Sequence, residues 1–135
     1  MRLLDPSHSS IPYPKFDAMK LIDYPAAIAE KQHQLLRAEQ HVRRQQEILN
    51  RLTAEIDTTI AFDTSLKNDA QRKARRVELM GSASYRTAYA NLQMAQDERA
   101  EMEIDLNLLR NQFGVLKLEK RETIAAREMQ LLDAA

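Results

Sequence analysis

Three side chains of the first half have types and spacing that could bind a metal. Glu30 and His33 are three residues apart, the Glu-x-x-His spacing of di-iron helical bundles. Such a site needs a second copy of the motif and two further glutamates on facing helices, and the chain holds one copy. His41 follows His33 by two helical turns, too far for both to bind one zinc ion. We expect no metal, although two copies of the chain could complete such a site.

A basic cluster in the middle of the chain could bind anions. Its members are Lys67, Arg72, Lys73, Arg75 and Arg76. Residues 63–81 carry five positive and three negative charges, a net +2. The cluster could contact a phosphate backbone or an acidic partner, or it could be a solvated helix face. It contains no aromatic residue for stacking bases, and Tyr85 and Tyr89 fall on or beside an apolar repeat, where we expect core packing.

The other polar groups indicate no catalysis. Successive carboxylates on a helix point in different directions, which favours a solvated face for the acidic stretch Asp97, Glu98, Glu101, Glu103 and Asp105. No phosphate-binding glycine loop, nucleophile elbow or zinc-protease motif is present. Serines lie at turn and capping positions. We therefore expect no enzyme, no catalytic residue and no cofactor.

Composition limits the class of protein. The 135 residues fit one domain, and 20 basic and 20 acidic side chains give zero net charge, unlike a globally basic nucleic-acid binder. The absence of Cys excludes disulfides and fits a reducing cytoplasm. We find no secretory signal and no charge-free apolar stretch of about 18 residues, so we expect a cytoplasmic protein without a membrane partner.

An apolar heptad repeat predicts the fold. It recurs as Ile28, Leu35, Val42, Leu49 and Ile56, then as Tyr85, Leu92, Arg99, Leu106 and Phe113, the latter followed at three residues by Ala88, Ala95, Met102, Leu109 and Leu116. A period of 3.5 residues places one apolar stripe along a helix, and another helix must cover it. The sequence predicts an all-α fold, a long antiparallel coiled-coil helical hairpin with a short elbow helix and an extended N-terminal arm.

The prolines and glycines suggest the boundaries. Residues 1–24 form the arm, which we expect to lie partly extended over a helix groove or to be a mobile tail. Residues 25–135 form the hairpin domain. It has a long helix over about 25–62, an elbow over about 63–81 that contains a short helix over roughly 69–80, and a long helix over about 83–132. Asn68 or Asp69 would cap the short helix and Gly81 would end it.

Folding at the elbow predicts which residues face each other. The expected neighbours are Ile56 with Tyr89, Val42 with Met102, and Leu35 with Leu109. Gln45 would meet Arg99, the one charged residue of the last helix's seam, in a polar layer that fixes the register. Alternatively, the Arg99 stem is buried and its head lies in water.

The last helix carries further apolar residues beyond its seam. We call these the second apolar line: Ile104, Leu108, Val115, Leu118, Ala125 and Met129. A helix with two apolar faces needs two neighbours. The arm or a second copy could cover this face, and we favour a homodimer, a helical bundle whose interface includes Ile104, Leu108, Val115, Leu118 and Met129.

The C-terminal half resembles a group of known proteins. Residues 68–73 (Asn-Asp-Ala-Gln-Arg-Lys), Ser84 and Tyr85 opening a long helix, and residues 109–118 (Leu-Arg-Asn-Gln-Phe-Gly-Val-Leu-Lys-Leu) are similar to small uncharacterised helical proteins of phages and mobile elements. The resemblance implies a cytoplasmic accessory protein encoded near recombination or replication genes. We expect a structural, non-enzymatic coiled-coil protein with an unidentified protein partner. The alternative is a nucleic-acid-binding accessory protein that uses the basic cluster.

Overall fold

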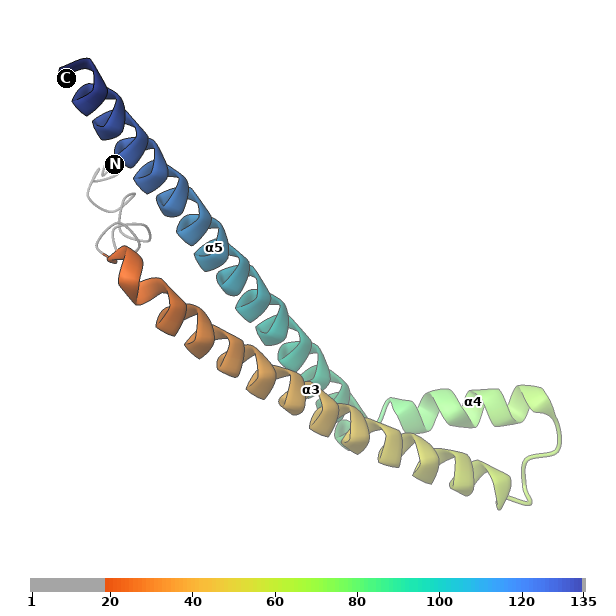
Figure 1. Ribbon diagram of the computed structural model, residues 1–135. Helices are drawn as coiled ribbons and strands as arrows, with labels where there is room; N and C mark the ends of the chain where they lie inside the picture. The colour runs from red at the N-terminus through yellow and green to blue at the C-terminus, as the bar shows by residue number, and fades with distance from the viewer. Residues whose placement is uncertain (1–18, 135) are drawn as a thin grey trace, which may run out of the picture. The chain divides into compact units, whose positions relative to one another are not determined.

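The computed structural model describes residues 19–134, which are helical almost throughout and contain no strand (Figure 1). A 3-10 turn, η1 (Leu21–Asp23), leads into α3 (Tyr24–Ala61), followed by α4 (Asp69–Met80) and α5 (Ala83–Ala134). The helix ends lie within two residues of those predicted. Most of the predicted arm, residues 1–18, is outside the described part. Its last residue, Tyr24, was assigned wrongly, because it opens α3.

Local hydrogen bonds explain where the helices begin and end. Pro25 lies in the first turn of α3, where a missing N–H has no helical partner to lose. The Asn68 Oδ1 accepts a hydrogen bond of 2.9 Å from the Gln71 amide, so Asn68, one of the two predicted candidates, is the N-cap of α4. The Gly81 amide donates to the Val77 carbonyl at 3.0 Å and closes the last turn of that helix.

The chain divides into two compact units, which are described separately. The central unit is His33–Glu103 and holds most of α3, all of α4 and the start of α5. The terminal unit joins Met1–Gln32 to Ile104–Ala135. Both long helices therefore contribute to both units.

The core of the central unit lies where α3 meets α5. Leu49 of α3 packs with Ala88 and Leu92 of α5, and the partly buried side chains around them are Val42, Leu52 and Tyr85. Ala38, Ile56 and Ala95 are also buried. α4 lies beside the end of α3, where Arg76 pairs with Asp57 (Figure 1), and none of its residues is buried.

An aromatic stack joins the two helices of the terminal unit. Tyr24, fully buried, stacks on Phe113 with ring centroids 5.5 Å apart and planes at 9°. The Lys117 ammonium lies 4.4 Å from the centre of the Phe113 ring, and Lys31 Nζ is 3.8 Å from Asp105 Oδ2. Leu106 and Leu109 are buried here, whereas the side chains from 117 to 134 are all exposed.

The predicted pairing of the long helices was shifted. Ile56 borders the same hollow as Tyr85 instead of lying near Tyr89. Val42 borders a groove with Gln96 and Arg99, not with Met102. These neighbours are shifted by four and by three residues from the predicted ones, a shift that again brings seam positions of the heptad against seam positions.

α4 returns along the end of α3, where Arg76 pairs with Asp57. The first residues of α5, Ser84 and Tyr85, border a hollow with Ile56 and Thr59 of α3.

The polar layer expected from Gln45 and Arg99 does not form. Gln45 borders a hollow with His41 and Asn91, whereas Arg99 is exposed and borders the separate groove beside Val42. No hydrogen bond joins the two side chains in the described structure. The same shift in register explains this error.

Within residues 19–134, no helix is both long enough and apolar enough to cross a membrane.

Candidate interaction surfaces

The basic cluster is exposed, but its arginines already have anionic partners. Arg72 Nη1 lies 3.0 Å from Asp69 Oδ1, and Arg75 Nη1 lies 2.9 Å from Glu78 Oε1. Arg76 pairs with Asp57 of α3. Asp69 and Glu78 are three residues from their arginines in the chain, whereas Asp57 is 19 residues from Arg76 and could not be identified as its partner from the sequence.

The two lysines of the cluster differ in their surroundings. Lys67 Nζ donates to the Thr64 carbonyl at 3.1 Å, and its backbone amide donates to Gln71 Oε1 at 2.5 Å. Lys73 is exposed and forms no ion pair in the described part of the chain. The ammonium groups of Lys67 and Lys73 therefore have no carboxylate partner in the described part of the chain. Exposed ion pairs are weak and could yield to a phosphate, so the pairing lowers the anion affinity of the cluster without removing it.

A short turn holds the loop before the basic cluster. Asp63 Oδ1 accepts hydrogen bonds from the Ser65 hydroxyl at 2.5 Å and from the Ser65 amide at 2.9 Å. These two bonds, the hydroxyl first, lower the pKa of Asp63 below its ordinary value. Both hydrogen bonds of this carboxylate therefore belong to the turn.

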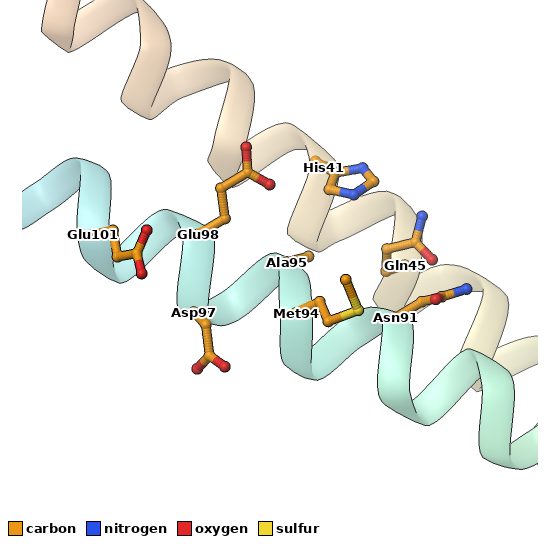
Figure 2. Close-up of a pocket in the computed structure, with 8 residues that line it drawn as sticks. All are labelled: His41, Gln45, Asn91, Met94, Ala95, Asp97, Glu98 and Glu101. Carbon is orange, nitrogen blue, oxygen red and sulfur yellow. The ribbon is translucent and has the colours of Figure 1, made fainter.

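A hollow of about 510 Å³ opens between α3 and α5 in the central unit. Figure 2 shows His41 and Gln45 reaching it from α3, with Met94 and Glu98 of α5 opposite. Asp97 points away from α3, so the carboxylates on this rim diverge. The carboxylates of this hollow therefore do not converge on one point.

The residues proposed for a metal site do not gather. Glu30 and His33 are exposed on α3, and His41 is half-buried beside the hollow. Among residues 19–134, no group of three or more His, Asp and Glu side chains could hold a metal ion.

A second hollow was not recognised from the sequence. It is lined by Met80, Tyr85, Arg86 and Tyr89, at the turn from α4 into α5. Core packing was expected for Tyr89 and was wrong, because the register brings Tyr85 onto the seam and leaves Tyr89 50% exposed one turn later. Tyr, Met and Arg are enriched in protein interfaces, and this composition was the available signal.

The second apolar line is largely exposed on α5 in the terminal unit. Ile104 is 65% exposed, Val115 52%, Leu118 57% and Met129 61%, while Leu108 is half-buried. Three further exposed apolar residues of α5 in the terminal unit were missed: Ile124, Leu131 and Leu132. A run of exposed apolar side chains on one helix is typical of a protein interaction surface.

These surfaces, and no enclosed polar site, are the candidates for function in the described part of the chain. Comparison with known proteins adds no identity, because no protein-family model, no curated protein and no solved structure matches the sequence.

Proposed function

We propose that this chain is a non-enzymatic protein-interaction protein that forms a homodimer. In this proposal α3 and α5 are the two arms of an antiparallel coiled-coil hairpin, joined by α4. The second apolar line on α5 is the interface with the second copy. The remaining faces, including the hollow beside Tyr89, are open to an unidentified protein partner.

The hairpin is supported by the seam residues of both units. Leu49 meets Ala88 and Leu92 at heptad positions in the central unit. In the terminal unit the stack of Tyr24 on Phe113 joins the start of α3 to a later turn of α5. Rising numbers on α3 thus meet falling numbers on α5, as an antiparallel pair requires.

The exposure of the second apolar line is the observation that carries the dimer. Burying one Leu or Val side chain is worth about 1.5–3 kcal/mol, so an uncovered series of them favours association. In the described structure, four side chains of the line (Ile104, Val115, Leu118 and Met129) are more than half exposed. A second copy offers the same apolar series, and closed two-fold association is the commonest outcome for such a surface.

Sedimentation equilibrium over a range of protein concentrations tests this proposal. The expected result is a reversible transition to twice the chain mass. A single species of monomer mass up to hundreds of micromolar would contradict the dimer.

The alternative is a nucleic-acid-binding accessory protein, favoured by the two unpaired ammonium groups of Lys67 and Lys73. It fits the resemblance to phage and mobile-element proteins, which we retain as a proposal together with the cytoplasmic location. The test is a gel shift of labelled DNA and RNA in low and high salt. Replacing Lys67, Lys73 and Arg72 with Ala should abolish a specific shift, whereas replacing Arg43, Arg44 and Arg51 of α3 should not. Binding that survives the first set would place the site elsewhere.

A further inference from the structure

The charges along α5 separate into two segments of opposite sign, the first of which includes Ile104 and the second Val115, Leu118 and Ala125 of the second apolar line. We call residues 97–105 the acidic segment; it holds five carboxylates and one cation, Arg99. Residues 110–127 form the basic segment, with five cations (Arg110, Lys117, Lys120, Arg121 and Arg127) and two carboxylates. One helix therefore carries a net −4 and then a net +3.

Most of these charges are exposed and unpaired within the described residues. In the acidic segment only Asp105 has an ion pair, with Lys31 at 3.8 Å. In the basic segment Lys117 lies over the Phe113 ring, and the other four cations have no carboxylate partner there. The two segments are consecutive on one helix, so their opposite charges cannot meet within one α5.

We propose that the dimer of this chain is antiparallel along α5, with the acidic segment of each copy against the basic segment of the other. This inference rests on the proposed function, because it concerns the orientation of the same dimer. It places Ile104 of one copy level with Val115 of its partner, and Glu101 level with Leu118, one turn from the partner's Arg121. Two-fold symmetry forms both acidic–basic contacts at once.

Charge decides the orientation because the apolar line alone does not. Its side chains recur at the same heptad spacing in either direction, so they could pair in a parallel or an antiparallel dimer. In a parallel dimer in register, the acidic segments of the two copies would lie against each other, and so would the basic segments. Like charges opposite each other are destabilising. Complementary charges give specificity and orientation more than affinity.

Charge reversal in pairs tests the contact. One variant carries Glu98→Lys and Glu101→Lys, and a second carries Lys120→Glu and Arg121→Glu. Each alone should dimerise more than about tenfold more weakly than the wild type at low salt. An equimolar mixture should form a heterodimer of near wild-type affinity, because each reversed segment then meets its opposite.

A control separates the contact from net charge. The variant with Glu47→Lys and Glu55→Lys, at exposed positions of α3, makes the same change of charge away from α5. It should dimerise as the wild type does. Helical circular dichroism of every variant should be unchanged.

Cross-linking tests the orientation directly, since the chain has no Cys of its own. Ile104→Cys and Val115→Cys are made in separate chains and treated with a short bismaleimide. The antiparallel dimer should cross-link strongly only in the mixture of the two. A dimer in which each variant cross-links to itself is parallel; that result overturns the orientation and leaves the proposed dimer intact. If the wild type is a monomer, both the orientation and the proposed dimer are overturned. If the charge variants fail to form a heterodimer when mixed, the charge contact is overturned.

Discussion

Two stretches of α5 have the same apolar period but differ in how much of their side chains is exposed. In the first stretch Ala88, Leu92 and Ala95 are at most 5% exposed, because α3 covers them in the central unit. In the second, Val115, Leu118 and Met129 are more than half exposed. A heptad repeat thus predicts that another helix must cover the apolar stripe. It does not predict whether that helix belongs to the same chain or to another copy.

The largest effect is expected from the buried stretch. Leu92→Ala should lower the free energy of unfolding by about 2–5 kcal/mol, because it leaves a cavity against Leu49 and Ala88. Urea unfolding followed by circular dichroism measures the change. A loss below 1 kcal/mol would mean that the α3–α5 seam is not the core.

The matched change in the exposed stretch should act on association. Leu118→Ala removes a side chain that is 57% exposed, so the monomer should lose little stability. The dimer should weaken by roughly tenfold to a hundredfold, because two leucines leave the symmetric interface. Sedimentation equilibrium measures the dissociation constant. If Leu118→Ala and wild type associate equally, the second apolar line is not the interface.

The cap of α4 tests how much the short helix depends on local bonds. Asn68→Ala removes the acceptor of the Gln71 amide bond and should cost about 1 kcal/mol. Hydrogen exchange of the α4 amides should accelerate more than that of the α3–α5 seam. Asn68→Asp, which retains the acceptor, should preserve protection, and equal acceleration across both regions would contradict a local role.

Gly114 lies in the exposed stretch of α5, and no packing contact in the described structure requires a glycine at this position. A Cβ added there would meet nothing within 4 Å. Gly114→Ala should therefore stabilise the helix by about 0.4–1 kcal/mol, seen as a higher melting temperature at low protein concentration. Destabilisation that appears only where the dimer is populated would instead show a close approach of the second copy at this turn.

The smallest effect concerns the loop between α3 and α4. The lowered pKa of Asp63 means that its contribution to stability is present above the ordinary value of 3.8 and is lost as the pH falls through the lower folded value. Ser65→Ala should move the Asp63 pKa back up toward the ordinary value. An NMR pH titration of the Asp63 carboxyl measures its pKa in the wild type and in Ser65→Ala. An unchanged pKa in the variant would exclude the Ser65 hydroxyl as the main cause of the lowered pKa.

The helices and their ends were predictable from the sequence because their signals are local. Asn68 can cap the next turn without any distant residue, and the apolar spacing of residues 28–56 identifies a helical face. All of these signals lie within a few turns of the residue concerned.

The register was not predictable, because the seam positions of a heptad recur after three or four residues, so they match again after a shift of that size. The position of α4 decides between such registers, and α4 is held to α3 by the pair of Arg76 with Asp57, which are 19 residues apart. Gln45, Arg99 and Tyr89 were all misplaced by this one error. The exposed second apolar line was recognised because periodicity exceeded what one partner helix could cover.

The stack of Tyr24 on Phe113 also gives the protein a built-in optical label. The chain contains no Trp and four Tyr, so its intrinsic emission comes from phenols that differ in their surroundings. Tyr24 is shielded from water, whereas Tyr89 is half exposed, so a quencher dissolved in water should extinguish Tyr89 before Tyr24. The shielded emission and the near-ultraviolet dichroism of the stacked rings would then report separation of the start of α3 from α5, before the remainder of either helix unwinds.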